Sequence, residues 1–339
     1  MRCKVWKRSL LFLLSVMTLC AVFSACGHTN TKKQNIQFFS MDTIMEITAY
    51  GECGKALSLA RERIETLDIM LDVTDPNSLV SSLQNGDAVD SDIAIPLQTV
   101  QQIAQKTNGA LDLTLYPLSA KWGFYSGEYC VPSPKIIQDL LDNRGTWSIE
   151  KNRFYCTDGL KPDLGCVAKG YAAQCAAETL RNNGVSSAVL MLGGNVQTLG
   201  QKPDGSDWII SVADPRQTDG TVGDLHVGEC AVVTSGSYQR NFTQNGRLYH
   251  HILDPSTGYP AESGLVSVTV VCKNGTMADA LSTALFIIGI DASKALYDQH
   301  VFSFDAIFIT EEHEIFLTEG LADRFEQTNE TYTPFTILR

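Results

Sequence analysis

Near the C-terminal end, the chain carries residues that could bind a metal ion and move a proton. Asp279 and Thr283 are four residues apart in a segment with helical periodicity, and residues at this spacing share one face of a helix. A carboxylate and a hydroxyl that point the same way can hold Mg²⁺ against phosphate oxygens. His250 and His251 could accept a proton, but they lie on a predicted strand, so only one of them can face such a site.

The same residues also have simpler structural explanations. Thr276 and Asp279 fit a capping box at the start of the helix, and the Thr283 hydroxyl could bond to a carbonyl of the preceding turn. A histidine on a strand is more often packed than catalytic. The run Asp-Pro-Ser-Thr-Gly at 254–258 is typical of a turn. The local pattern therefore leaves both interpretations open.

A second group of residues lies at the start of another predicted helix. Lys169 falls in the first turn of a helix expected over residues 167–182, where the helix dipole disfavours a cation unless an anion is also present. Free amide groups and a lysine together make a phosphate site, although a solvated lysine is about equally plausible. Gly193-Gly194-Asn195 follows a buried strand and indicates either a tight turn or close approach to a ligand.

Several common nucleotide and hydrolase motifs are missing from the sequence. It has no G-x-G-x-x-G fingerprint and no glycine loop followed by a Walker lysine. Ser235 does not stand in a G-x-S-x-G elbow, so a serine hydrolase triad is not predicted.

The elements that must position these groups can be read from periodicity and from turn residues. We expect helices over residues 55–71, 95–108, 134–143, 167–182, 277–288 and 293–299. We expect strands within residues 36–50, 146–156, 188–192, 208–213, 230–234, 248–253, 265–272, 305–310 and 314–318, and extended chain at 110–118. Strands arrive in runs rather than alternating with helices, which predicts an α+β fold with mixed or largely antiparallel sheets.

The N-terminus has the basic, apolar and small-residue parts of an export signal over residues 1–25. Cys26 follows small residues, as in a bacterial lipobox, and we expect it to be lipidated. An ordinary cleaved signal and an uncleaved anchor are the alternatives. Residues 26–35 then form a polar tether, and residues 36–339 form the functional domain. We expect a location at the extracytoplasmic face of the cell membrane, with no further membrane-spanning segment.

Charge and cysteine content restrict the partners. Four of the 26 basic residues lie in the signal, which leaves 22 against 38 acidic residues and a net charge of −16. Nucleic acid is therefore not an expected partner. Seven cysteines follow Cys26 without zinc spacing, and we interpret them mostly as small apolar residues, although one disulfide stays open.

Five motifs in their order along the chain resemble the ApbE family of FAD:protein FMN transferases. They are Met41-Asp-Thr43, Gly109-Ala-Leu-Asp112, Asp163-Leu-Gly-Cys-Val-Ala-Lys169-Gly-Tyr, Gly193-Gly-Asn195 and the run from His251 to Thr283. The resemblance extends from about Phe39 to the C-terminus. It implies an ApbE-like, T-fold-like α+β protein that uses FAD and Mg²⁺ to attach FMN through a phosphoester bond to a Thr or Ser of a target protein, with release of AMP.

The resemblance also implies site residues. FAD would be contacted by Met41, Ala110, Leu111, Asp112, Asp163, Lys169 and Leu253. The metal would be held by the Cys166 carbonyl and by Asp279 and Thr283, with Ser282 close by. His251, rather than His250, aligns with the histidine of the family, and we expect it to be the general base.

Three positions depart from the family pattern. Cys166 and Asp42 stand where the family usually has glycine, and Ser282 stands where it often has aspartate. The metal would then have one carboxylate fewer. Two other functions stay open: an FAD pyrophosphatase that releases FMN and AMP, and a flavin-binding lipoprotein without turnover. Expected partners are FAD, an acceptor flavoprotein subunit and the membrane.

Overall fold

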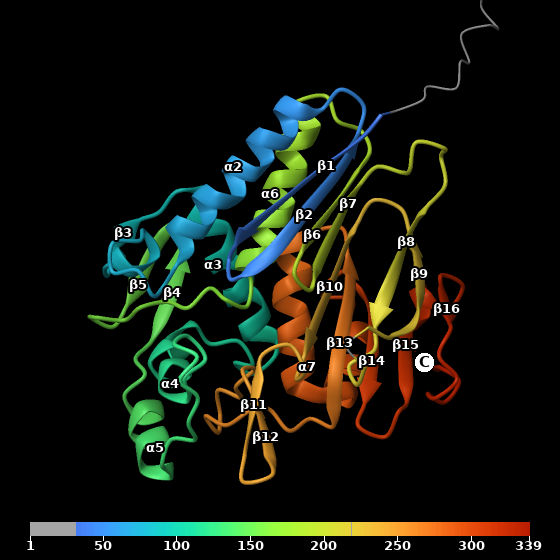
Figure 1. Ribbon diagram of the computed structural model, residues 1–339. Helices are drawn as coiled ribbons and strands as arrows, with labels where there is room; N and C mark the ends of the chain where they lie inside the picture. Colours follow the sequence, from blue (N-terminus) through green and yellow to red (C-terminus); the bar gives the residue numbers. More distant parts are fainter. Residues whose placement is uncertain (1–31, 218) are drawn as a thin grey trace, which may run out of the picture. The chain divides into compact units, whose positions relative to one another are not determined.

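The computed structural model describes residues 32–217 and 219–339, and the fold is that of the compact unit Lys33–Arg339. Its centre is a nine-stranded sheet (Figure 1). The strands in spatial order are β1 (Lys33–Ser40), β2 (Thr43–Tyr50), β6 (Ala188–Leu192), β7 (Asn195–Leu199), β10 (Ala231–Gly236), β13 (Leu265–Cys272), β14 (Asp305–Thr310), β15 (Ile315–Thr318) and β17 (Thr336–Leu338). All neighbours pair antiparallel except β15 and β17.

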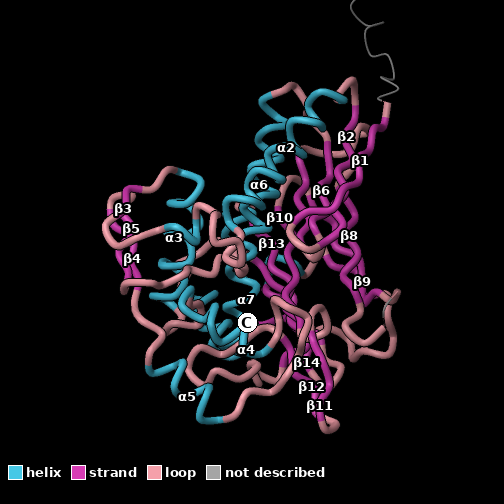
Figure 2. Tube along the Cα trace, turned by 60° about the vertical axis from the view of Figure 1, so that its left-hand side comes forward, coloured by secondary structure: helices cyan, strands magenta, loops and turns pink. Residues whose placement is uncertain are grey.

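One face of this sheet is covered by helices (Figure 2). They are α2 (Gly54–Leu71), α6 (Ala168–Asn182) and α7 (Gly275–Asp298), while α3 (Ser91–Lys106) packs against α7. Helix α6 packs between α2 and α7, and α7 lies against β10 and β13. Alternate residues of each strand face these helices, so the main core joins the sheet to the helical layer.

The opposite face is covered by a three-stranded sheet. It contains β8 (Trp208–Ala213), β9 (Thr221–Val227) and β16 (Phe325–Gln327). A second core lies between the two sheets and includes Trp208 and Leu225 from the small sheet and Val232 and Val271 from the large one. Because β10 and β13 face helices on one side and a sheet on the other, they are buried on both faces, and the first half of β10 and most of β13 are apolar.

The remaining elements surround the helical layer. A small sheet contains β3 (Asp87–Ala88), β5 (Arg153–Cys156) and β4 (Trp147–Glu150), and a hairpin contains β11 (Asn241–Gln244) and β12 (Arg247–His250). The short helices are α4 (Tyr116–Trp122) and α5 (Pro134–Asp142), with 3₁₀ turns η1 (Val80–Ser82), η2 (Leu113–Leu115) and η3 (Glu319–Leu321). A third apolar cluster joins α4, α5 and the hairpin around Trp122.

The expected α+β class with largely antiparallel sheets is confirmed, and most predicted elements are present. The extended chain expected at residues 110–118 is wrong, because η2 and α4 occupy residues 113–118. Pro117 stands in the first turn of α4, where its fixed φ suits a helix, and Gly123 ends the helix with φ +84°. The strand expected over residues 248–253 is too long, since β12 ends at His250.

The start of α7 differs from the capping box that Thr276 and Asp279 suggested. The cap is Asn274, whose Oδ1 accepts the Met277 N–H at 2.8 Å, while the Thr276 hydroxyl donates to Gln174 Oε1 at 2.9 Å. The break expected between two helices is present as a kink at Gly289, where φ is +77°. By length and composition α7 would also suit a membrane span, but Ala278, Leu281 and Leu285 are fully buried, as in a core helix.

Most of the cysteines agree with the interpretation as small packed residues, whereas Cys130 is exposed. Among the residues that the structure describes, Cys130, Cys156, Cys166, Cys175, Cys230 and Cys272 are free thiols. Burial raises the pKa of Cys175, Cys230 and Cys272, so these thiols stay protonated.

Candidate functional site

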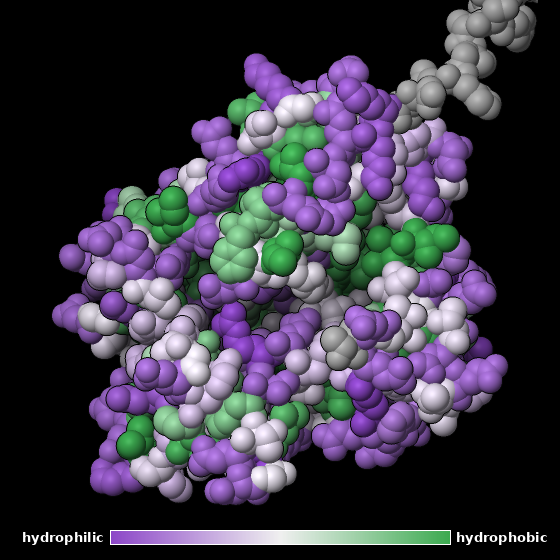
Figure 3. Space-filling view, in the orientation of Figure 1, coloured by the Kyte–Doolittle hydropathy of each residue, from purple (hydrophilic) through white to green (hydrophobic). Residues whose placement is uncertain are grey.

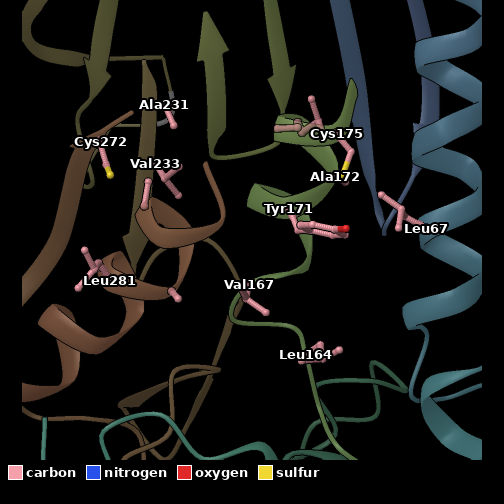
Figure 4. Packing of buried hydrophobic residues seen from close by; sticks show 14 of the residues in the cluster. Leu67, Leu164, Val167, Tyr171, Ala172, Cys175, Ala231, Val233, Cys272 and Leu281 are labelled. Atoms are coloured by element: carbon pink, nitrogen blue, oxygen red, sulfur yellow. The ribbon is translucent and has the colours of Figure 1, made fainter. Parts of the chain in front are cut away.

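The loop before α6 gives that helix a defined start. The Leu164 carbonyl accepts the N–H groups of Val167 and Ala168 at 3.0 and 2.9 Å, so α6 begins at Ala168 and Lys169 lies in its first turn, as predicted. Leu164 and Val167 are buried below this turn (Figure 4). The half-buried Lys169 therefore stands at the positive end of the α6 dipole, a combination that suits a phosphate.

Helices α6 and α7 touch where two glycines meet. A Cβ on Gly170 would lie 2.3 Å from the Gly275 carbonyl oxygen and 2.5 Å from Cβ of Asp279, and a Cβ on Gly275 would lie 2.8 Å from the Gly170 carbonyl oxygen. Such distances exclude any larger residue without a shift of one helix. The Gly170 N–H consequently reaches Asp279 Oδ2 and donates to it at 2.7 Å.

Asp279 is a buried carboxylate beside a cation. Its exposed fraction is 5 %, and its pKa is raised, because burial outweighs the charge of Lys169 and the Gly170 N–H, which lower it. The Asn195 amide also favours the ionised form, although its Nδ2 makes no hydrogen bond of normal geometry within the described residues. The carboxylate thus lies at the start of α6, where sequence reasoning expected a phosphate and a metal to meet.

Three hydroxyl groups lie together, two of them on α7 shortly after Asp279 and one on β10. Ser282 Oγ donates to the Asp279 carbonyl oxygen at 2.8 Å, and Ser235 Oγ on β10 lies 2.8 Å from Ser282 Oγ and 3.2 Å from Thr283 Oγ1. The carbonyl bond that the sequence suggested for Thr283 is therefore made by Ser282. Thr283 is partly exposed, whereas Ser282 is fully buried.

Asp163 lies in the same region and is held by three partners. Its Oδ2 accepts the Tyr125 hydroxyl, its Oδ1 accepts the Gly165 N–H at 2.9 Å, and its N–H donates to the Leu113 carbonyl at 2.8 Å. Burial raises the pKa of Asp163, whereas these donors and the charge of Arg240 lower it. Burial and the neighbouring Asp163 raise the pKa of Tyr125, so its hydroxyl keeps the proton that it donates.

The two histidines have different surroundings. His251 Nδ1 lies 3.2 Å from the Arg240 carbonyl oxygen, and its ring packs edge-on against Phe124 with centroids 6.4 Å apart. A carbonyl only accepts hydrogen bonds, so Nδ1 must carry the proton, and Nε2 keeps its lone pair. Burial, Lys169 and Arg240 lower the pKa of His251 to about 3, so the ring is neutral at pH 7. His250 instead lies in the core, edge-on to Phe286.

Some of the residues predicted to contact the flavin lie in a turn, and others are buried. Met41 and Asp42 form the turn between β1 and β2 with φ of +48° and +59°, and Asp68 Oδ2 accepts the Met41 N–H at 2.9 Å. Positive φ at both positions is the geometry that favours glycine, which accounts for the glycine that the family usually has where Asp42 stands. Asp42 pairs with Arg240 at 3.5 Å.

The other predicted contacts have buried side chains. Ala110, Leu111 and Leu253 are at most 6 % exposed, so only a small part of each residue is open to a ligand. Asp112 caps η2 by accepting the Thr114 N–H and pairs with Arg144 at 3.3 Å. The hydrogen bond from the Asp163 N–H to the Leu113 carbonyl places Asp112 near the Asp163 loop.

Cys166 lies in the loop between Asp163 and Lys169, as the sequence required for its carbonyl to act as a ligand. Burial, with the charges of Asp163 and Asp279, raises the pKa of its thiol. A protonated thiol is a poor nucleophile and metal ligand, which leaves the carbonyl as the group that could serve. The predicted lipidation site, Cys26, lies outside the described residues.

Sequence reasoning did not identify Arg240 and Tyr125 as site residues. Arg240 joins the β1–β2 turn, through Asp42, to the loop after α4, where its Nη1 donates to the Phe124 carbonyl at 3.3 Å. No motif surrounds either residue, and only the folded chain brings them to Asp163 and His251. On the face shown in Figure 3 the surface is hollowed near its middle, below the end of the β1–β2 hairpin.

Comparisons with known proteins show which family the chain resembles. The family model of the ApbE family matches residues 41–308. An FAD:protein FMN transferase of Treponema pallidum is 28 % identical over 95 % of this chain and 96 % of its own, and one of Klebsiella pneumoniae is 32 % identical over 70 % and 74 %.

Solved structures show the same fold. The ApbE protein of Thermotoga maritima superposes with a TM-score of 0.74 at 30 % identity, covering 88 % of this chain and 98 % of its own. The apo flavinyl transferase ApbE of Pseudomonas stutzeri superposes with a TM-score of 0.71 at 29 % identity, covering 83 % and 92 %. The motifs, the fold and the relatives therefore agree that this chain belongs to the ApbE family.

Proposed function

We propose that this protein is an FAD:protein FMN transferase that moves FMN from FAD to a Thr or Ser hydroxyl of a target protein and releases AMP. The proposal rests on its relatives, which carry that name, and on one observation of the site. Contact of α6 with α7 places a buried carboxylate, Asp279, against the helix start that carries Lys169. A carboxylate repels a phosphate, so the two groups can lie side by side only if a cation lies between them.

The residues present fit Mg²⁺. The Asp279 carboxylate, the Thr283 hydroxyl and the Cys166 carbonyl are oxygen donors, which Mg²⁺ prefers, and it commonly takes further oxygens from phosphates and water. Among residues 32–217 and 219–339 no three His, Cys, Asp or Glu residues gather as a metal site, so a site here would depend on such mixed donors. A bound Mg²⁺ would neutralise charge on the pyrophosphate.

The transfer itself balances with groups of this chain. Lys169 and the positive end of the α6 dipole would hold the pyrophosphate. The target hydroxyl oxygen would bond to the FMN phosphorus while the bond from that phosphorus to the AMP oxygen breaks, and AMP would leave with its electron pair. His251 Nε2 would accept the hydroxyl proton, since its Nδ1 proton is held by the Arg240 carbonyl.

The low pKa of His251 suits this role only when substrate is bound. Lys169 and Arg240 are two of the causes that lower it. A pyrophosphate beside Lys169 would cancel part of that positive field and raise the pKa toward its ordinary value, which makes Nε2 a better base at the moment it is needed.

The test is to incubate the protein with FAD, Mg²⁺ and a target protein that carries an acceptor Thr, and then to weigh the target. Covalent FMN together with AMP release supports transfer. Free FMN without labelled target would indicate an FAD pyrophosphatase, in which water replaces the hydroxyl, and intact FAD would leave a flavin-binding role. Asp279→Ala should abolish the Mg²⁺-dependent reaction; undiminished activity would remove Asp279 from the site.

We also propose that the protein acts at the extracytoplasmic face of the membrane, anchored through a lipid on Cys26 and a tether over residues 26–35. The motif around Cys26 supports this. Cys26→Ser should release the protein from the membrane fraction of cells; retention of the variant would contradict the lipid anchor.

A further inference from the structure

Ser235 is a hydroxyl in an otherwise apolar row of β10. Alternate residues of a strand share a face, and the residues of this row before it, Ala231 and Val233, belong to the core between the sheet and the helices (Figure 4). Ser235 is itself 8 % exposed. A buried hydroxyl without a hydrogen-bond partner is costly. Ser235 has two possible partners, Ser282 and Thr283 on α7.

The directions of the hydrogen bonds in this cluster follow from counting protons. Each hydroxyl carries one proton. Ser282 donates its proton to the Asp279 carbonyl, which can only accept. In the 2.8 Å contact between Ser235 and Ser282, the donor must then be Ser235.

Thr283 is left with one possible role in its 3.2 Å contact with Ser235. Because the Ser235 proton is already given to Ser282, Thr283 must be the donor. Its own proton therefore points into the protein toward β10, and its lone pairs are left for another partner. A hydroxyl with its proton turned away is the form that can coordinate a cation.

We propose that Ser235 is a positioning residue that fixes the Thr283 hydroxyl with its lone pairs toward the metal. Three hydroxyls, Thr283, Ser235 and Ser282, form a one-way chain that ends on the backbone of Asp279. The inference rests on the proposed function, because it presumes a metal at Asp279 and Thr283. It also gives Ser282 a purpose other than direct ligation, as the acceptor that holds the Ser235 proton away from Thr283.

The test measures Mg²⁺ binding to the full-length protein by calorimetry, without FAD, for Ser235→Ala, Ser282→Ala and the double variant. Loss of a group that orients a ligand typically weakens metal affinity about 10- to 100-fold, and we expect that loss for Ser235→Ala. Ser282→Ala should act in the same direction, because Ser235 could then turn its proton toward Thr283. Thermal melting without Mg²⁺ checks that each variant is folded.

The double variant separates a hydrogen-bond chain from ordinary packing. If Ser282 acts through Ser235, adding Ser282→Ala to Ser235→Ala should weaken Mg²⁺ binding no further, whereas independent packing defects would add. Ser237→Ala is the matched control, since Ser237 donates to the Val266 carbonyl at 3.3 Å instead of to α7, and its affinity should equal that of wild type.

Two results would overturn the inference. A Mg²⁺ affinity of Ser235→Ala within twofold of wild type would show that Ser235 does not position Thr283, as would additive losses in the double variant. Absence of Mg²⁺ binding in wild type both without FAD and with FAD present, together with intact FMN transfer, would refute the metal site itself and leave the transferase proposal standing. Failure of wild type to transfer FMN, with Mg²⁺ binding intact, would instead count against the proposed function alone.

Discussion

Replacing Gly170 with alanine tests the contact on which the site depends. The new Cβ would lie 2.3 Å from the Gly275 carbonyl oxygen and 2.5 Å from Cβ of Asp279. Both neighbours belong to α7, and the nearer is backbone, so the clash can be relieved only if the helices separate by about 1 Å, given carbon–carbon contacts of about 3.5 Å.

The cost has two parts. Overpacking of this kind destabilises by about 1–3 kcal/mol. Separation also breaks the 2.7 Å bond from the Gly170 N–H to the Asp279 carboxylate, and a hydrogen bond to a charged group contributes about 1.5–3 kcal/mol. We therefore expect a loss of about 3–5 kcal/mol, which corresponds to a fall in Tm of roughly 6–10 °C at about 2 °C per kcal/mol for a chain of this size.

The assay is thermal melting of Gly170→Ala beside Gly54→Ala. Gly54 also lies in the first turn of a helix, α2, but a Cβ there would meet only Gln34 Oε1 at 3.4 Å, an ordinary contact. The control should melt within about 2 °C of wild type, because alanine at most adds about 1 kcal/mol of helix propensity. FMN transfer should fall in Gly170→Ala alone. If Gly170→Ala melted like Gly54→Ala and kept full transfer, the glycine would not set the spacing of α6 and α7.

Three further predictions follow from the electrostatics and the backbone. In the folded protein the pKa of His251 is lowered from 6.5 to about 3. Below pH 6.5 the unfolded chain therefore binds a proton that the folded protein does not, and the folded protein loses stability as pH falls. Urea titrations should show that His251→Gln loses less stability than wild type between pH 6.5 and 4, and equal losses would contradict this. Asp42 has φ +59°, so Asp42→Gly should raise the free energy of unfolding by up to about 1 kcal/mol. The exposed ion pair with Arg240 that is lost contributes little to stability. A lower Tm would show that the ion pair outweighs the backbone strain. Arg63 forms a partly exposed ion pair with Asp92, which also accepts the Tyr171 hydroxyl. A hydrogen bond to a charged group contributes about 1.5–3 kcal/mol, so Arg63→Ala should lower the free energy of unfolding, measured in urea, by about that amount. The double variant Arg63→Ala/Asp92→Ala should lose less than the sum of the two single variants.

The sequence predicted well those features that depend on neighbouring residues. The helix at 55–71 has its buried residues Leu57, Ile64 and Leu67 at the expected spacing, and Lys169 lies in the first turn of its helix. Periodicity, caps and turn residues act within a few positions of one another, so they are visible in a linear chain.

Features that depend on long-range contact were missed or left undecided. The Gly170–Asp279 bond joins residues 109 positions apart, and Ser235 meets Ser282 across 47. The residues beside Gly170 and Ser235 in the sequence do not indicate these distant partners. The helix α4 was missed because its seven residues are too few to show a period.

The position of β1 has a practical consequence for handling the protein. This strand is at the edge of the large sheet and ends at the turn of Met41 and Asp42. Eight residues of strand at about 3.3 Å each span about 25 Å, so Lys33 lies at the far end of the hairpin from the site. An affinity tag or fluorescent protein joined directly before Lys33 would thus begin well away from the turn of Met41 and Asp42, and such a fusion should be usable for enzyme assays.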